Sequence, residues 1–343
     1  MRFSNFLFPA SMHPDDDQRI IQETLAEARL CDALGLEMLW LAEHHFDGIC
    51  AYVDPVTFAA AIASCTERIE IGFAVAQTSL HHPIRLAEQL ALIDNISRGR
   101  LVVGLGRGTA YNIYDYLGFG IDPEEAQARL IEAEAVMIEA WTTENYEHRG
   151  QFWNLRLPLL RPRPYTRPHP RIIRACATEE SAVEMAHAGR PFLMNVQSND
   201  VTRHRMDRYR TTMRESGYDD AAIARNVADT WIWRNVYVAE SDAEAERVAL
   251  PAFEAQTAFR QAMRTRVYEE QGLLLKPAGP AARNEARHSL ICGSPATVAE
   301  AIAEIDAIGV GGLILAFRIG PMPWDVAEAS IRLFMQKVAP EFR

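Results

Sequence analysis

The sequence predicts an α/β fold, a (β/α)8 barrel that occupies residues 1–343 as a single domain. Short apolar runs alternate with longer stretches of helical spacing along most of the chain, as in repeated β-α-β units. The short runs are apolar almost throughout, which is typical of parallel strands that are covered on both faces. The length of 343 residues also suits one such barrel.

Local capping signals divide the first half of the chain into elements. Asp54 followed by Pro55 is typical of a helix start, and Pro83 begins another helix in the same way. Gly35 and Gly99 follow periodic segments and are expected to end helices. The predicted strands are 3–8, 38–42, 69–76 and 101–105, and the predicted helices are 17–34, 55–67, 83–97 and 123–142.

Two segments interrupt the alternation in the second half. Residues 145–171 are rich in arginine and in proline, which excludes a helix and interrupts a central strand, so we expect a hairpin or an extended arm on the surface. Residues 262–291 have no period and are expected to form a mobile lid before the last strand. The other predicted strands are 172–177, 192–196, 230–238 and 312–317, with helices at 179–188, at 200–216, from residue 242 and at 324–338.

The composition excludes several classes of protein. The formal net charge is −11 and no basic stripe occurs, which argues against nucleic acid as a partner. The five cysteines include no C-x-x-C pair, so neither a zinc site nor a disulfide framework is expected. The N-terminal apolar run is too short for a signal peptide, and no run of about 18 apolar residues occurs elsewhere. We therefore expect a cytoplasmic protein without membrane contact.

The segment LWLAEHHFDG, residues 39–48, places titratable side chains at the exit of a buried strand. Adjacent residues of a strand point to opposite faces, so His44 and His45 are not expected to share a metal ion. A histidine at the carboxyl end of a barrel strand lies where catalytic residues usually sit, and it can act as an acid or a base near neutral pH. The alternative is a hydrogen-bonded histidine at the rim of the barrel.

A glycine-rich turn, VVGLGRGTAY, follows the fourth predicted strand at 102–111. It departs from the dinucleotide-binding fingerprint, because Thr109 replaces the third glycine and the turn does not follow the first strand. Arg107 remains informative, since an arginine in a tight loop at the end of a strand can hold a phosphate through two hydrogen bonds. The alternative is a surface arginine in a turn.

The helices expected at 55–66 and 84–97 carry small and apolar residues on nearly every side. A helix that is apolar all round must be buried all round. The strands of a barrel can cover only one face, so we expect a homodimer with these two helices at its centre. The alternative is a long neighbouring segment that covers them.

Several segments, taken together, resemble the bacterial luciferase-like flavin monooxygenases, with the luciferase alpha chain (alkanal monooxygenase) as the nearest branch. They occur in the same order as in that family, which makes them more specific than any single motif. The segments are MRFSNFLF, WLAEHHF, HPIRLAEQLALIDNISRGRLVVGLGRG and GSPATVAEAIAEIDAIGVGGLIL.

The resemblance implies a barrel that binds reduced FMN at the carboxyl ends of its strands. His44 matches the family's catalytic histidine and would transfer a proton during the reaction. Glu43 and His45 would line or brace the site, and Phe46 and Trp231 are candidates for a dry substrate pocket.

The resemblance also implies how the cofactor would be held. Arg107 matches the family's phosphate-binding arginine, and Arg129 matches a second arginine from the next helix. Thr178 and Ser181 fall where the family supplies hydroxyl and backbone N–H groups from a helix start, which is a good anion site on physical grounds. Ala74–Val75 matches a cis peptide bond beneath the flavin ring.

The implied activity is that of a two-component monooxygenase. A separate flavin reductase would supply FMNH2, O2 would form a flavin C4a-hydroperoxide, and an aldehyde, a ketone or another apolar organic molecule would be oxygenated. One alternative is a deazaflavin-dependent oxidoreductase of the same superfamily that transfers hydride, and another is a non-catalytic flavin-binding relative. Gly106 replaces a reactive cysteine of luciferase, which weakens the case for light emission but not for monooxygenation.

Overall fold

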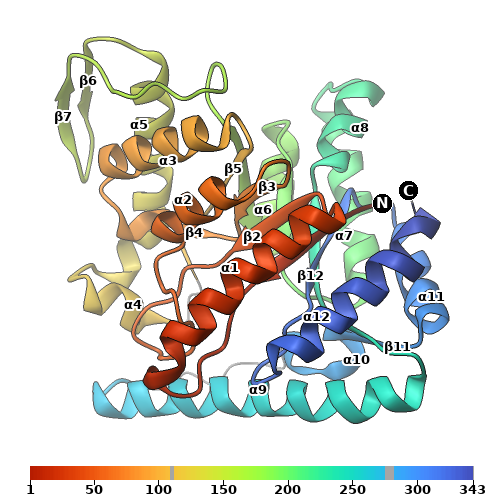
Figure 1. Cartoon of the computed structure of the whole chain (residues 1–343). Helices are drawn as coiled ribbons and strands as arrows, with labels where there is room; N and C mark the ends of the chain where they lie inside the picture. Colours follow the sequence, from red (N-terminus) through yellow and green to blue (C-terminus); the bar gives the residue numbers. More distant parts are fainter. Residues whose placement is uncertain (109–111, 275–281, 343) are drawn as a thin grey trace.

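The computed structural model describes residues 1–108, 112–274 and 282–342. Within these residues, eight parallel strands close into a barrel with helices around it (Figure 1), so the predicted (β/α)8 fold is confirmed. Each predicted strand is one of the eight. In order around the barrel they are β1 (Arg2–Leu7), β2 (Met38–Leu41), β3 (Glu70–Phe73), β5 (Leu101–Gly106), β8 (Arg171–Cys176), β9 (Phe192–Met194), β10 (Trp231–Val238) and β12 (Gly312–Ala316), which pairs with β1.

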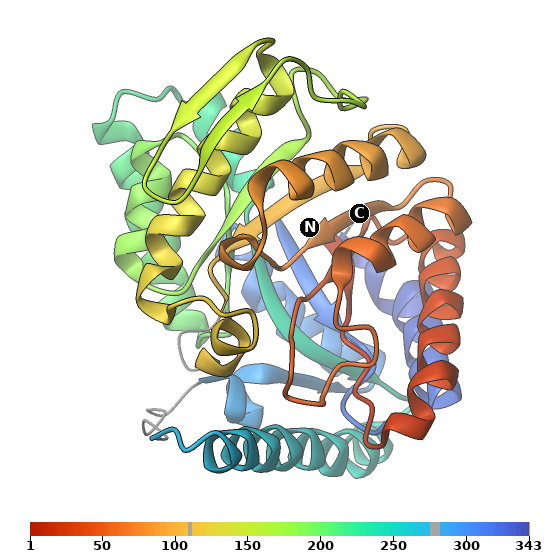
Figure 2. The ribbon, with the colours of Figure 1, turned by 90° about the vertical axis from the view of Figure 1, so that its left-hand side faces the viewer.

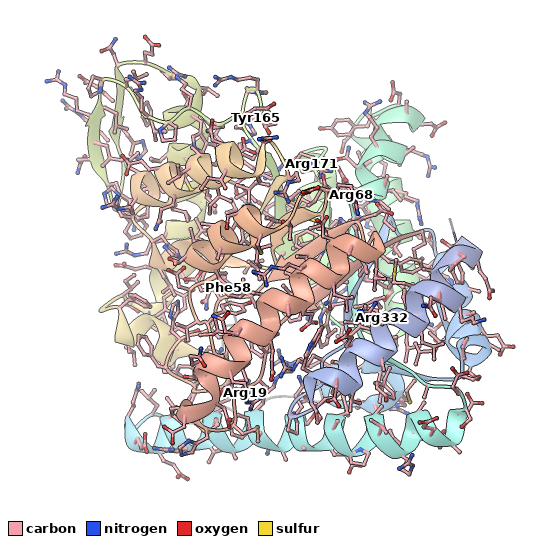
Figure 3. All side chains as sticks on the ribbon, viewed as in Figure 1. Arg19, Phe58, Arg68, Tyr165, Arg171 and Arg332 are labelled. Atoms are coloured by element: carbon pink, nitrogen blue, oxygen red, sulfur yellow. The ribbon has the colours of Figure 1, made fainter. Side chains whose placement is uncertain are left out.

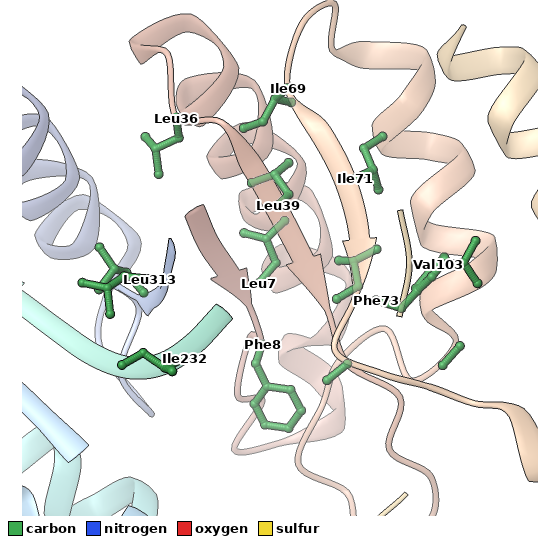
Figure 4. Close-up of a cluster of buried hydrophobic side chains, with 14 of the residues drawn as sticks. Leu7, Phe8, Leu36, Leu39, Ile69, Ile71, Phe73, Val103, Ile232 and Leu313 are labelled. Carbon is green, nitrogen blue, oxygen red and sulfur yellow. The ribbon is translucent and has the colours of Figure 1, made fainter. Parts of the chain in front are cut away.

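Side chains of the barrel strands alternate between the barrel interior and the surrounding helices. Trp40 of β2 packs in the interior, whereas Leu39 belongs to the outer cluster, part of which Figure 4 shows. Glycine is required where two strands approach closely, because a Cβ atom on Gly104 would lie 1.5 Å from the carbonyl oxygen of Phe73. With both faces covered, these strands have the continuous apolar pattern seen in the sequence.

The predicted helix boundaries agree closely with the structure. The Asp54 side chain accepts a hydrogen bond of 3.0 Å from the backbone N–H of Val56, and Gly35 ends the first helix with a φ of 78°. The main helices are α1 (Asp17–Leu34), α2 (Pro55–Cys65), α3 (Pro83–Ser97), α5 (Ala126–Thr142), α6 (Glu179–His187), α7 (Asn199–Glu215), α8 (Asp220–Ala228), α9 (Asp242–Glu270), α11 (Pro295–Asp306) and α12 (Trp324–Leu333).

Several elements lie in segments for which the sequence pattern predicted none. Besides α8 and α11, they are α4 (Ile113–Gly118), α10 (Ala286–Ser289) and β11 (Leu290–Gly293), whereas β4 (Ala76–Gln77) begins at the last residue of the predicted strand 69–76. β11 pairs with β10 outside the closed barrel.

The arm expected at 145–171 contains an antiparallel hairpin, β6 (Tyr146–Arg149) and β7 (Asn154–Leu157). Its C-terminal half is tied to α3, because the backbone N–H of Thr166 donates a hydrogen bond of 2.7 Å to Asp94. Figure 3 shows Tyr165 at the surface beside the end of α3, where 58% of the residue is exposed. The prediction of a surface hairpin is therefore confirmed.

The predicted lid is only partly irregular. α9 continues to Glu270, so the absence of regular structure expected for 262–270 is wrong, and residues 275–281 lie outside the described part of the chain. α9 crosses the end of the barrel at which the strands end, as Figures 1 and 2 both show. The role of a mobile lid stays a prediction.

The apolar helix α2 is covered largely by its own chain. It packs against both α1 and α3, and only Thr57 and Ser64 are exposed. Phe58, labelled in Figure 3, stacks on Tyr52 with ring centroids 4.8 Å apart. For α2, neighbouring segments therefore provide the cover that was expected from a second subunit. Among the described residues, no helix combines the length and the apolar character needed to cross a membrane.

Candidate active site

The titratable side chains singled out in the sequence gather at the carboxyl ends of β1, β2, β3 and β5. The barrel interior is closed below this point by fully buried side chains such as Trp40 and Trp231. Phe6 and Trp233, one layer closer to the mouth, are only partly buried. The mouth of the barrel is therefore the part of the interior that a ligand can reach.

His44 lies at this mouth with its side chain 28% exposed. Its Nδ1 is 3.3 Å from Nδ2 of Asn112 and 3.6 Å from a carboxylate oxygen of Asp47. The ring edge meets Phe8, with centroids 5.1 Å apart. Among the described residues, only Nδ1 has a polar neighbour, so Nε2 is the nitrogen left for a ligand.

The protonation state of His44 follows from its surroundings. Burial lowers the pKa of His44 to about 4; the carboxylate of Asp47 opposes this, and the positive charges of Arg260 and Arg283 lower it further. The imidazole is therefore uncharged at neutral pH. An uncharged imidazole can accept a proton from a ligand and return it.

Glu43 points away from His44 and holds a network of its own. One carboxylate oxygen is 2.9 Å from Nε2 of His45 and 2.8 Å from Nε2 of His81, and the other accepts a hydrogen bond of 2.6 Å from the backbone N–H of Gln77. Burial by itself would raise the pKa of Glu43, but the hydrogen bonds from His45 and His81 outweigh it and hold the pKa at about 2. Glu43 and His45 therefore brace the loop that carries His44.

Asp115 of α4 joins this loop to the segment after β3. It accepts a hydrogen bond of 3.3 Å from the backbone N–H of His45 and one of 3.1 Å from Nε2 of Gln77. Burial raises the pKa of Asp115 to about 7, although the hydrogen bond from Gln77 opposes this. Sequence reasoning missed Asn112, Asp115 and Gln77, because their partners come from other loops, and it assigned no role to Asp47 although this residue lies in the segment 39–48 beside His44.

One of the aromatic candidates for the substrate pocket lies elsewhere than expected. Trp231 begins β10 at the amino end of the barrel, where it packs on Trp40 at 5.6 Å beneath the guanidinium group of Arg2. The assignment of Trp231 to a pocket at the mouth is therefore wrong, because the residue fills the closed end of the core. Phe46 is 50% exposed and its ring packs against Phe119 at 5.5 Å.

The peptide bond between Ala74 and Val75 is cis, as the resemblance implied. Both residues border the same interior cluster as Trp233. The space beside Val75 is narrow, because a Cβ atom on Gly106 would lie 2.7 Å from Cγ2 of Val75. Nε1 of Trp233 is buried without a hydrogen-bond acceptor among the described residues. An apolar wall with one unsatisfied N–H group suits a flat ligand with polar edges, such as a flavin ring.

The predicted phosphate-binding residues are only partly brought together. Arg107 is exposed at the end of β5, and Thr178 and Ser181 follow β8, the strand that pairs with β5. Thr178 and Ser181 cap α6 reciprocally, so their hydroxyl groups are engaged at the helix start. The guanidinium group of Arg129 instead pairs with Glu125 at 2.8 Å and lies 4.5 Å above the ring of Phe152.

A further cation approaches the start of α6 from α7. Burial lowers the pKa of Arg205, while the charge of Glu179 and a smaller effect of Cys176 oppose this. Its Nη1 is buried without a hydrogen-bond partner among the described residues. The sequence carried no signal for this residue, which is one of several arginines in a polar helix.

Comparison with known proteins agrees with this geometry. The family model described as luciferase-like monooxygenase matches residues 1–311. The uncharacterized protein y4wF of Sinorhizobium fredii is 30% identical over 307 residues, which cover 89% of this chain and 86% of that protein. The oxygenase component of the flavin-dependent trigonelline monooxygenase of Acinetobacter baylyi is 30% identical over 173 residues, 50% of this chain and 48% of that enzyme.

Solved structures show the same barrel. Monooxygenase RslO1 of Streptomyces bottropensis has a TM-score of 0.85 at 28% identity, with 100% of both chains covered. An F420-dependent secondary alcohol dehydrogenase, with a TM-score of 0.76 at 16% identity over 100% of this chain and 99% of that one, shares the fold alone. Since the family model covers residues 1–311 of 343, this chain belongs to the luciferase-like monooxygenase family.

Proposed function

We propose that this protein is the oxygenase of a two-component monooxygenase, which forms a flavin C4a-hydroperoxide from FMNH2 and O2 and oxygenates an aldehyde, a ketone or another apolar organic substrate. One oxygen atom would enter the substrate, and the other would leave as water. The observation that carries the proposal is His44, which is uncharged at neutral pH and packs against the ring of Phe8 at the mouth of the barrel. Bound FMNH2 would supply the electrons that activate O2.

The chain offers groups for each part of FMN. The wall formed by Ala74, Val75 and Trp233 would receive the ring, and the Nε1 group of Trp233 would donate a hydrogen bond to it. Arg107, together with the N-terminus of α6, would receive the phosphate. Arg129 would have to leave Glu125 to take part.

The other residues of the site would transfer a proton and keep water away from the reacting atoms. His44 would accept or donate a proton through Nε2, the nitrogen that has no polar neighbour among the described residues. Phe6, Phe8 and Trp233 would exclude water from the reacting oxygen, which protects a reactive intermediate from decay. Glu43 would keep its loop in place through His45 and His81.

A flavin reductase is the partner that this activity requires. The name of the relative from Acinetobacter baylyi, an oxygenase component, supports a separate supply of reduced flavin. The reductase would deliver FMNH2 by diffusion or through a transient contact.

The proposal is tested by mixing the protein with FMNH2 without oxygen and then admitting O2. A transient absorbance spectrum that differs from those of reduced and oxidised flavin is expected, followed by product when aldehydes or ketones are present. Arg107→Ala should weaken FMN binding about 10-fold or more but leave riboflavin, which lacks the phosphate, unaffected. Arg149→Ala, an exposed position on the arm, is the control.

Cofactor binding and the fate of the reduced cofactor distinguish the two alternative functions. A deazaflavin-dependent oxidoreductase would bind F420 instead of FMN, in keeping with the shared fold of the F420-dependent dehydrogenase. A non-catalytic relative would bind FMN, and its reduced form would return to oxidised flavin with every aldehyde and ketone unconsumed. Either result would contradict the proposed function.

We also propose that the chain forms a homodimer, now through the outer face of α3 rather than α2. Leu92 and Ile96 of α3 are 52% and 41% exposed, and Ile131 of the adjoining helix α5 is 49% exposed. Leu92→Glu with Ile96→Glu should convert a dimer into a monomer in light scattering coupled to size-exclusion chromatography. A monomeric wild-type protein would contradict this.

A further inference from the structure

Asn112 is a buried amide that faces the imidazole of His44. It lies directly before α4, a position at which an asparagine side chain commonly accepts a hydrogen bond from the first turn of the helix. Its side chain makes no such bond. The amide group lies instead 3.3 Å from Nδ1 of His44, and 3% of the residue is exposed. The side chain of Asn112 therefore contacts the imidazole rather than capping its own helix.

The carboxylate of Asp47 reaches the same nitrogen from the loop that follows His44. One oxygen lies 3.6 Å from Nδ1, and the other accepts a hydrogen bond of 3.0 Å from the backbone N–H of Ile49, which holds the carboxylate in place. The side chain of Asp47 is 4% exposed, so water screens its charge poorly. Two buried polar groups, from two segments of the chain, therefore converge on Nδ1.

These two segments are also joined at a second point. Asp115 of α4 accepts a hydrogen bond of 3.3 Å from the backbone N–H of His45. The ring of Phe8 meets the ring of His44 at an interplanar angle of 71°, which supports the imidazole from another side. The contact between Asn112 and His44 is therefore a fixed part of the site.

The position of the hydrogen on His44 decides what the uncharged ring can do. An uncharged imidazole has one N–H group and one bare nitrogen, and only the bare nitrogen can accept a proton. Which nitrogen carries the hydrogen is set by the hydrogen bond that the other nitrogen, or the N–H group itself, makes. The neighbours of Nδ1 therefore determine whether Nε2 meets a ligand as a base or as a donor.

The neighbours of Nδ1 favour a hydrogen on this nitrogen. The carboxylate of Asp47 carries only acceptors, and a bare Nδ1 would turn its lone pair toward that negative charge. The amide of Asn112 can present its oxygen or its nitrogen, because the two ends have nearly the same shape. With the nitrogen toward His44, Oδ1 is buried without a partner among the described residues. With the oxygen toward His44, Oδ1 accepts a hydrogen bond from Nδ1.

We propose that Asn112 and Asp47 are positioning residues that hold the hydrogen of His44 on Nδ1 and so leave Nε2 bare as the base of the site. The reaction that this base serves rests on the proposed function, whereas the position of the hydrogen does not. When Nε2 takes a proton from an O–H group of a ligand, the O–H bond breaks, its electron pair stays on the oxygen, and the ring becomes an imidazolium. Burial lowers the pKa of His44 and opposes this charge, but the carboxylate of Asp47 favours it.

The test locates the hydrogen by ¹⁵N NMR of the full chain, labelled in its ten histidines. A nitrogen that carries hydrogen and a bare nitrogen have clearly different chemical shifts, and the signals missing from His44→Ala are those of His44. At neutral pH the wild-type ring should carry the hydrogen on Nδ1 in an excess of about 10-fold or more over Nε2.

Variants at the two positioning residues test their roles. Asn112→Ala removes an acceptor and Asp47→Asn supplies a donor to a bare Nδ1, so each should shift the ratio toward Nε2 about 10-fold or more. Asn112→Asp can only accept, so it should keep the hydrogen on Nδ1. Asn226→Ala is the control, because its amide bonds to the carbonyl of Ala222 on α8 at 2.9 Å, and the His44 signals should not change.

Turnover should follow the position of the hydrogen. Asn112→Ala and Asp47→Asn should lower kcat about 10-fold or more with little change in KM, because the substrate still binds but Nε2 no longer accepts a proton. Asn112→Asp should retain most of the wild-type kcat. A variant that moves the hydrogen to Nε2 and keeps the wild-type kcat would overturn the role of these residues in the reaction.

Two results of the NMR measurement would also overturn the inference. The first is a wild-type ring with its hydrogen on Nε2, and the second is an unchanged ratio in both Asn112→Ala and Asp47→Asn. Because the NMR measurement needs neither flavin nor turnover, a hydrogen on Nδ1 in a protein that fails to oxygenate any substrate would support the arrangement around His44 while contradicting the proposed oxygenase.

Discussion

Replacing His44 with alanine is expected to lower the rate of product formation about 100-fold or more, while FMN still binds. The imidazole lies at the mouth of the barrel and is uncharged at neutral pH, and its Nε2, which has no polar neighbour among the described residues, can accept a proton from a ligand. Without it, reduced flavin should still react with O2, but the oxygen should leave as hydrogen peroxide. The measurement is the ratio of product to hydrogen peroxide for each FMNH2 consumed.

A matched control separates this effect from a general loss of structure. His187 lies at the far end of α6 and bonds to Ser216 at 2.9 Å, so His187→Ala removes an imidazole away from the mouth. The control should keep the wild-type ratio of product to peroxide. If His44→Ala also keeps that ratio, His44 has no part in the reaction.

The pH dependence of the reaction rate provides a second test of the role of His44. Because its pKa is lowered to about 4, the imidazole remains unprotonated throughout the range in which an ordinary histidine titrates, near 6.5. The rate should therefore show no decline on acidification from this group until the pH approaches 4. A decline centred near 6.5 that disappears in His44→Ala would show that the residue titrates normally.

Replacing Glu43 with alanine is expected to lower the free energy of unfolding by about 3–5 kcal/mol. Removal of the carboxylate leaves His45, His81 and the backbone N–H of Gln77 without their common acceptor in a buried position. Total stabilities are only about 5–15 kcal/mol, so urea unfolding should shift clearly. Glu43→Gln, which keeps the shape but not the charge, should lie between wild type and alanine.

The exposed ion pair on α3 provides the control for Glu43. Glu88 lies 3.5 Å from Arg85, and the two side chains are 42% and 74% exposed. Glu88→Ala removes an ion-paired carboxylate of the same length, yet it should change the free energy of unfolding by less than about 1 kcal/mol. A loss in Glu43→Ala no larger than in this control would contradict the bracing role.

The contribution of Glu43 should also depend on pH. The pKa of Glu43 falls from 4.5 to about 2 on folding, so its contribution is complete above 4.5 and is lost as the pH falls toward 2. Burial lowers the pKa of His81, but the hydrogen bond and the charge of Glu43 outweigh it and raise this pKa above 6.5. The interaction between His81 and Glu43 therefore stabilises the fold fully below pH 6.5, and this stabilisation is lost as the pH rises through the raised pKa. The stability difference between wild type and Glu43→Ala should therefore be largest between pH 4.5 and 6.5.

The barrel could be predicted because its signals are local. Each strand is a short apolar run, and helices such as α2 and α3 begin at a proline, so the pattern in a short window predicts the element. α8 and α11 were missed, although both have N-caps that bond to the first turn. Each of these helices begins shortly after another helix or strand, and its sequence pattern was not separated from that of the neighbouring element.

The candidate site was predictable only in part. His44 and Arg107 could be found because each lies at the end of a strand and within a motif that resembles a known family. Trp231 was assigned wrongly, although its place at the start of the predicted strand 230–238 already puts it at the amino end of a parallel barrel. The structure gives that end directly, through the contacts of Trp231 with Trp40 and Arg2.

The sequence by itself determined the fold, the position of His44 at the end of a strand and the membership of the luciferase-like monooxygenase family, because these depend on local pattern and on ordered motifs. Only the tertiary structure decided which charges surround His44. Asp47 lies in the same loop, but Arg260 and Arg283 arrive from the far end of the chain when α9 packs across the barrel. The pKa of a side chain depends on charges and burial in three dimensions, and no spacing along the chain contains them.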